Sequence, residues 1–197
     1  MDRTVAIFHG YGGNKPSSWL SWLNKQLIDR GVATIYPAFP PMGSSTIKDW
    51  YSEFSKYIKD TNEPISIVGH SGGTTFSFYL AQNSDIKIEK MILVCPLNDI
   101  SGADTSALVH KPEVQDQVPF IRNFVHQNFD FDIIRSRVKE FIFILSDNDH
   151  NVPYEETKKY FQNIFPEAKF ITLHNYGHVN EKAGITDLPQ VLDELLK

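Results

Sequence analysis

The sequence contains a single cysteine, no excess of positive charge and no long apolar run. Cys95 has no second cysteine with which to form an internal disulfide, and this sparse usage is typical of a reducing, cytoplasmic setting. With 19 Lys and Arg against 24 Asp and Glu, the formal net charge is −5, and no basic cluster is present. No segment has the length of a membrane span, and the start of the chain lacks a signal-peptide pattern. We therefore expect a cytoplasmic protein without a nucleic-acid or membrane partner, and a protein partner is left open.

The sequence does contain a regular alternation of short apolar runs and longer amphipathic runs. Its 197 residues can bury a substantial core, and without repeats or linkers they predict one domain spanning residues 1–197. Apolar, β-branched runs are typical of strands covered on both faces, and their alternation with helices predicts a parallel sheet. The predicted strands are Thr4–Phe8, Ala33–Tyr36, Ile65–Val68, Lys90–Val94, Phe141–Leu145 and Lys169–Leu173. The predicted helices are Ser17–Asp29, Thr46–Lys59, Gly72–Gln82, Tyr154–Asn163 and Asp187–Leu196.

One stretch combines a strand, a tight turn and a helix around a serine. Gly69, Ser71 and Gly73 have the Gly-x-Ser-x-Gly spacing of a nucleophile elbow, directly after the strand that begins at Ile65. Glycines are needed there because neighbouring backbones come close at a strained turn. The turn would place the Ser71 hydroxyl at the carboxyl edge of the sheet and at a helix N-terminus, which favours negative charge. Ser71 is therefore the predicted nucleophile.

A second glycine-containing loop follows the first strand. In His9-Gly10-Tyr11-Gly12-Gly13, a His-Gly pair and small residues come directly after Phe8. Such a loop supplies one backbone N–H of an oxyanion hole, and the residue after the nucleophile supplies the other. We expect the N–H groups of Tyr11 and Gly72 to fill these roles.

Acids and histidines also follow strands. Asp147 and Asp149 come after the fifth predicted strand and Asp99 after the fourth, and each is a candidate acid. After the sixth strand, His178 lies in a glycine-containing loop, whereas His174 lies at the strand end. The order Ser, Asp, His is that of an α/β-hydrolase, and parallel strands would bring all of them to one edge of the sheet.

The segment from Ser101 to Arg137 interrupts the strand–helix alternation. It is too long for a simple crossover and contains four phenylalanines, including Phe120 and Phe124. We interpret it as one or two short helices that form a small cap over the carboxyl edge. The alternative is that its aromatic residues only pack a longer crossover. In the cap, Phe120 and Phe124 would line the acyl side of a pocket. Trp19 either packs in the core or also contacts substrate.

Together these stretches resemble the α/β-hydrolase superfamily. Within it, they resemble the compact family that includes the retinoblastoma-binding serine hydrolase and many bacterial hydrolases. The resemblance rests on His9-Gly10-Tyr11-Gly12-Gly13 with Trp19-Leu20-Ser21-Trp22-Leu23, on Gly69-His70-Ser71-Gly72-Gly73, on Ser146-Asp147-Asn148-Asp149-His150-Asn151-Val152-Pro153 and on Gly177-His178.

The resemblance implies a three-layer, doubly wound α/β fold. Its parallel sheet would have six strands in the order 2-1-3-4-5-6 and no N-terminal antiparallel hairpin. The family pattern places the catalytic acid three residues before the Val of Val-Pro, which is Asp149. The chain departs from many relatives in having His150 rather than proline after this acid.

The residues and the resemblance together predict a serine hydrolase that cleaves small acyl esters or related acyl compounds. Ser71 would attack, His178 would take its proton, and a carboxylate would orient the imidazole. We expect no cofactor and no metal, because the candidate triad accounts for the acids and no metal-ligand spacing is present. The alternative is a protein-binding module on a hydrolase scaffold.

Overall fold

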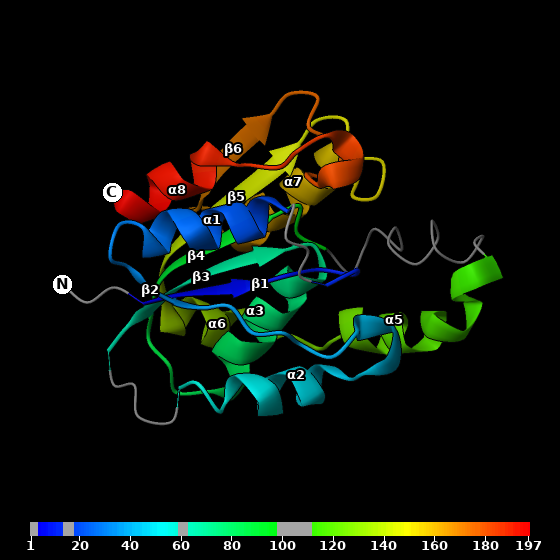
Figure 1. Cartoon of the computed structure of the whole chain (residues 1–197), viewed down its shortest axis with the longest axis horizontal. Helices are drawn as coiled ribbons and strands as arrows, with labels where there is room; N and C mark the ends of the chain where they lie inside the picture. Colours follow the sequence, from blue (N-terminus) through cyan, green and yellow to red (C-terminus); the bar gives the residue numbers. More distant parts are fainter. Residues whose placement is uncertain (1–3, 14–17, 59–62, 98–111) are drawn as a thin grey trace.

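A computed structural model describes residues 4–13, 18–58, 63–97 and 112–197 of the chain. Its centre is a six-stranded, all-parallel sheet in the order β2-β1-β3-β4-β5-β6 (Figure 1). The strands are β1 (Thr4–Phe8), β2 (Ala33–Ile35), β3 (Ile65–His70), β4 (Ile88–Val94), β5 (Val138–Ser146) and β6 (Lys169–Leu173). The predicted fold class and strand order are confirmed, and three of the strands are longer than predicted.

Helices lie on both faces of this sheet (Figure 1). They are α1 (Trp19–Ile28), α2 (Ile47–Phe54), α3 (Gly72–Asn83), α5 (Val118–Val125), α6 (Phe131–Arg137), α7 (Tyr154–Ile164) and α8 (Pro189–Leu196), with short 3-10 turns η1 (Met42–Ser44), η2 (Pro112–Gln117) and η3 (Glu181–Ala183). α2 is shorter than predicted and begins with a reciprocal cap between Thr46 and Asp49. The predicted helix start at Ser17 and helix end at Lys59 lie outside the described residues.

The alternation of side chains along each strand builds two cores. In β1, Ala6 and Phe8 join the cluster under α2, α3 and α6, whereas Val5 and Ile7 join the cluster under α1 and α8. All four side chains are buried. Because both faces of the sheet are covered, its strands are continuously apolar, which is why they could be predicted from the sequence.

The segment that was expected to form a cap divides into two differently placed helices. α5 packs against η1 and α3, and two of its residues line a cavity at the carboxyl edge. α6 instead contacts α3 and β5, so it covers a face of the sheet as an ordinary crossover helix. Phe129 and Phe131 pack on Phe78 of α3. The cap therefore stays a prediction for α5, which lies beside the cavity, whereas the aromatic residues after α5 pack the crossover. Residues 101–111 lie outside the described part.

The strands end in register at one edge of the sheet. Phe8 pairs with Gly69, His70 with Val94, and Ser146 with Leu173. The loops after β1, β3, β5 and β6 therefore emerge side by side, as expected for an open parallel sheet.

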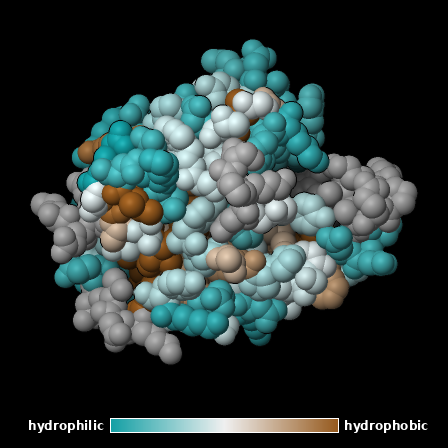
Figure 2. All heavy atoms as spheres, viewed as in Figure 1, coloured by the Kyte–Doolittle hydropathy of each residue, from teal (hydrophilic) through white to brown (hydrophobic). Residues whose placement is uncertain are grey.

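The outer surface carries few broad apolar areas on the face shown in Figure 2, where polar residues (teal) surround separate apolar patches (brown). Among the described residues, no helix combines the length and the apolar character that a membrane span requires.

Candidate active site

Ser71 lies at the turn between β3 and α3, with a backbone conformation that L-residues rarely adopt. Its φ is 53° and its ψ is −120°. The turn is held at both sides, because the Ser71 N–H donates to Val94 O (3.0 Å) and the Thr74 N–H donates to Ser71 O (2.9 Å). The hydroxyl group is thus presented at the carboxyl edge of the sheet and at the N-terminus of α3.

Gly69 and Gly73 permit this turn by their lack of side chains. A Cβ atom on Gly73 would lie 2.3 Å from Phe8 O in β1, and one on Gly69 would lie 2.8 Å from Gly73 O. Both distances are far below van der Waals contact with backbone atoms. The spacing of the elbow motif is therefore a steric requirement of packing α3 against β1 and β3.

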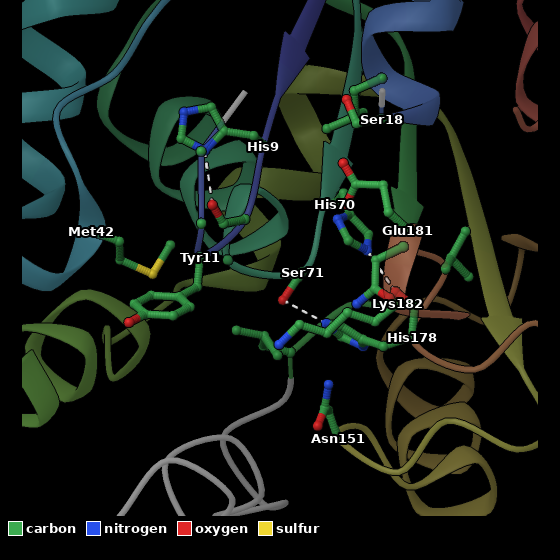
Figure 3. A pocket seen from close by; sticks show the side chains of 18 of the residues that line it. His9, Tyr11, Ser18, Met42, His70, Ser71, Asn151, His178, Glu181 and Lys182 are labelled. Carbon is green, nitrogen blue, oxygen red and sulfur yellow. Dashed lines mark hydrogen bonds between the residues drawn. The ribbon is translucent and has the colours of Figure 1, made fainter. Parts of the chain in front are cut away.

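The His178 ring lies between Ser71 and Asp149. Its Nε2 is 3.0 Å from Ser71 Oγ, and its Nδ1 is 2.7 Å from Asp149 Oδ2 (Figure 3 shows the first contact). A carboxylate only accepts, so Nδ1 carries a proton, and Nε2 of the neutral ring can accept from the serine hydroxyl. The side chain of His178 is 14% exposed and that of Asp149 only 2%. The arrangement can move a proton from Ser71 to a ring whose cation faces a carboxylate.

Asp149 is fixed by further donors. Its Oδ1 accepts hydrogen bonds from the N–H groups of Asn151 (2.8 Å) and Val152 (3.1 Å). Burial by itself raises the pKa of this carboxyl group, but the hydrogen bonds from His178, Asn151 and Cys95 outweigh it and hold the pKa below its ordinary value. Asp149 is therefore ionised at neutral pH.

Cys95, at the end of β4, completes a group of three possible metal ligands. Ligand atoms of Cys95, Asp149 and His178 lie within 4.8 Å of one another. Burial and the neighbouring Asp149 charge raise the pKa of the Cys95 thiol well above its ordinary value, and the thiol donates a hydrogen bond to Asp149. The protonated thiol therefore adds one more hydrogen-bond donor to the Asp149 carboxylate.

The other candidate acids have different surroundings. Asp147 is exposed, and its carboxylate pairs with His174 Nδ1 (2.7 Å) and accepts from the Asn175 N–H (2.9 Å). Asp147 and His174 thus pair with each other at the rim rather than with His178. Asp99 lies outside the described residues.

The loop after β1 lies directly beside the elbow. A Cβ atom on Gly10 would be 2.8 Å from Ser71 Cβ and 3.3 Å from Gly72 N, so this backbone packs against the predicted oxyanion donor. His9 shapes the loop by donating from Nδ1 to Gly10 O (2.8 Å), and burial lowers the pKa of its ring. The Tyr11 hydroxyl donates to Gln117 Oε1 (2.8 Å). The oxyanion role predicted for Tyr11 concerns its backbone N–H group and not this hydroxyl.

A cavity of about 370 Å³ opens over Ser71. Figure 3 shows Tyr11 and Met42 on the opposite side of Ser71 from His178. Lys182 and Asn151 lie near the histidine side. The apolar residues that line the cavity include Leu20, Met42, Leu97, Ile121, Val125 and Val179 together with Trp19.

Two of the predicted pocket residues do not line this cavity. Phe124 is fully buried and packs edge-to-face on Trp50, with ring centroids 4.8 Å apart, and Phe120 is 43% exposed. The cavity is lined by Ile121 and Val125 of the same helix instead. Trp19 does line it, but its indole N–H donates to Val179 O (2.8 Å).

Sequence reasoning missed the residues that hold the loop carrying His178. Asn148 Oδ1 accepts from the Gly177 N–H (2.8 Å), and Ser146 Oγ accepts from the Tyr176 N–H (3.1 Å). The signal was present as a run of short polar side chains after an apolar strand. Such residues commonly bond to backbone groups, but their partners 29 and 30 positions away are not encoded locally.

Comparisons with known proteins agree with the fold. The profile of the family described as "Serine hydrolase" matches residues 5–197. The ydeN gene product from B. subtilis superposes with a TM-score of 0.79 at 25% identity, over 98% of this chain and 97% of that one. Est1E from Butyrivibrio proteoclasticus has a TM-score of 0.69 at 20% identity, over 99% and 89% of the two chains. A carboxylesterase from the thaumarchaeon Nitrososphaera gargenis gives 0.69 at 15% identity, over 99% and 89%. No curated protein sequence matches the chain.

Proposed function

Because the chain belongs to the serine hydrolase family, we propose that it cleaves small, uncharged acyl esters through an acyl-enzyme on Ser71. One observation supports this most directly: the His178 ring is within hydrogen-bond distance of both Ser71 Oγ and Asp149 Oδ2. Such a chain of contacts converts a weak hydroxyl nucleophile into an effective one.

In the first half of the reaction, Ser71 Oγ attacks the carbonyl carbon of the ester while His178 Nε2 takes the hydroxyl proton. The negative charge that develops on the carbonyl oxygen is stabilised by the N–H groups of Tyr11 and Gly72 and by the N-terminus of α3. The intermediate then collapses, and the alcohol leaves with the proton from His178. The product is an ester of Ser71.

In the second half, His178 Nε2 takes a proton from a water molecule that attacks the acyl carbon. The intermediate collapses, Ser71 Oγ receives the proton back, and the free acid leaves. Asp149 remains ionised in both halves and stabilises the imidazolium form of His178. Its low pKa supports this role, because a carboxylate that took up the proton could not stabilise the cation.

The cavity supports a small, neutral acyl group. Met42, Ile121 and Val125 give one side an apolar lining, and a volume of about 370 Å³ is at the lower end of ordinary ligand pockets. Glu181 and Lys182 lie on the other side, where the alcohol part of the ester would leave.

A fluorophosphonate probe tests this function without knowledge of the natural substrate. Wild type should be labelled covalently on Ser71 and should hydrolyse p-nitrophenyl acetate, and Ser71→Ala should lose both activities. Ser44→Ala, which changes an exposed serine, is the matched control and should behave as wild type. A folded wild-type protein that is labelled at another residue, or not at all, would overturn this proposal. The unlabelled outcome would fit the alternative, a protein-binding module on a hydrolase scaffold.

A further inference from the structure

The loop that carries His178 contains unusual backbone conformations. We call residues 174–180 the histidine loop. Within it, Asn175 and Val179 have φ values of 64° and 47°, and Gly177 has 52°. Val179 stands out, because a β-branched side chain rarely occupies the left-handed region, and this side chain is fully buried. Such a conformation persists only where surrounding contacts hold it, and it directly follows the candidate catalytic histidine.

Two ring N–H groups hold this part of the loop. His70 Nε2 is 3.0 Å from the carbonyl oxygen of His178, and Trp19 Nε1 donates to the carbonyl oxygen of Val179 at 2.8 Å. A carbonyl oxygen only accepts, so the His70 proton is on Nε2. The Trp19 and His70 rings meet edge-to-face, with centroids 5.6 Å apart, and both are buried. Consecutive carbonyl groups on either side of the strained residue are thus anchored by two side chains that also support each other.

The two anchors come from different elements, and one of them directly adjoins the nucleophile. His70 is the last residue of β3 and directly precedes Ser71, and Trp19 is the first residue of α1. Burial, followed by the neighbouring His178, lowers the pKa of His70 to about 3, so its ring is neutral and has a single N–H to donate. That N–H is committed to the histidine loop. The same short segment of chain therefore fixes both Ser71 and the backbone of His178.

We propose that Trp19 and His70 are positioning residues that set the distance between His178 Nε2 and Ser71 Oγ by anchoring the carbonyl groups of His178 and Val179. This inference rests on the proposed function. It gives Trp19 a different role from the predicted one of substrate binding. A positioning residue affects the chemical step for every substrate alike, whereas a pocket wall affects binding and the preference for acyl length.

Three substitutions test the anchors. His70→Leu removes the donor, and His70→Gln retains an N–H donor at a similar reach. Trp19→Phe removes the indole N–H but keeps an aromatic ring. Trp22→Phe, in the same helix and only partly buried, is the matched control. Each variant is assayed for kcat and KM on p-nitrophenyl esters of increasing acyl length and for the rate of fluorophosphonate labelling, after circular dichroism has shown that it is folded.

We expect His70→Leu and Trp19→Phe to lower kcat and the labelling rate by about 10- to 100-fold, because a misplacement of about 1 Å can cost that much. KM should stay within about twofold, and the order of preference among acyl lengths should not change. His70→Gln should recover most of the loss, and Trp22→Phe should match wild type. Wild-type kcat in folded His70→Leu and Trp19→Phe would overturn the proposal, as would a His70→Gln variant as slow as His70→Leu. A changed KM or acyl preference in Trp19→Phe would make Trp19 a substrate-binding residue instead.

A measurement on wild type separates this inference from the proposed function. The Trp19 indole N–H should exchange slowly with solvent by NMR, because it is buried and bonded to Val179 O. Rapid exchange would overturn the anchor whether or not Ser71 reacts with the probe. Slow exchange together with an unlabelled Ser71 would contradict the proposed function alone.

Discussion

At the scale of single residues, two Asp–His pairs lie on neighbouring loops but differ in burial. Asp149 and His178 are largely shielded from solvent, whereas the His174 side chain is 76% exposed and that of its partner Asp147 is 34% exposed. A charge pair in a shielded site interacts far more strongly than one in water. Only the buried pair contacts Ser71, so the two carboxylates should differ sharply in their effect on catalysis.

Exchange of each carboxylate for an amide tests that difference. Asp149→Asn should lower kcat by about 10⁴-fold, because an amide at this place favours the wrong tautomer of the histidine. Asp147→Asn, the matched control, changes the same group two residues away and should keep kcat within a few-fold of wild type. Steady-state kinetics on p-nitrophenyl acetate gives both values. A similar loss in both variants would mean that the loop, rather than the Asp149 carboxylate, is what matters.

At the scale of elements, the orientation of α5 decides which of its side chains line the cavity. Phe124 is turned into the core against Trp50, which leaves the face with Ile121 and Val125 toward the cavity. These two residues are one helical turn apart, as residues on one face must be. The helix therefore contributes medium-sized aliphatic side chains to the cavity rather than phenylalanines.

Shortening these aliphatic side chains should change the preference for acyl length. Ile121→Ala and Val125→Ala should shift the highest kcat/KM toward longer p-nitrophenyl esters, by on the order of 1–3 kcal/mol per methylene accommodated. Phe120→Ala alters an exposed residue of the same helix and serves as the control. An unchanged length profile in both cavity variants would show that the acyl group lies elsewhere.

At the scale of the whole molecule, the buried ring of His70 links folding to pH. Its pKa is about 3 in the folded chain, against an ordinary value of 6.5. Burial is the main cause, and the nearby His178 and His9 rings also lower the pKa. The hydrogen bond to the His178 backbone and the Asp149 charge partly oppose them. Below pH 6.5 the unfolded chain takes up a proton that the folded chain does not. The contribution of the neutral His70 ring to the free energy of unfolding is therefore fully present above about pH 6.5. It decreases as the pH falls from there toward 3.

The resulting loss should be measurable by urea unfolding at pH 7 and pH 5. Over that interval, wild type should lose about 2 kcal/mol more unfolding free energy than His70→Gln, which cannot take up the proton. His150→Gln replaces an exposed histidine and should show the wild-type difference. If the free energy of unfolding depended on pH identically in wild type and His70→Gln, the lowered pKa of His70 would be contradicted.

Much of the fold followed from local pattern. The apolar runs predicted all six strands because a sheet covered on both faces needs continuously apolar strands. The elbow at Ser71 was visible because Gly69 and Gly73 are steric requirements of adjacent backbone. The strand order came from the resemblance to a family. The strands and the elbow could be predicted because the residues that determine each of them lie close together in the sequence.

The tertiary structure decided the features that depend on distant partners. Whether Asp147 or Asp149 faces His178 depends on how the loop after β5 bonds to the histidine loop, through Ser146 and Asn148. Whether Phe124 or Ile121 faces the cavity depends on Trp50, which belongs to another helix. The indole of Trp19 bonds to a carbonyl group 160 residues away. Sequence periodicity specifies which residues are buried, but the partner of a polar group in a strained loop is set only when the elements have packed.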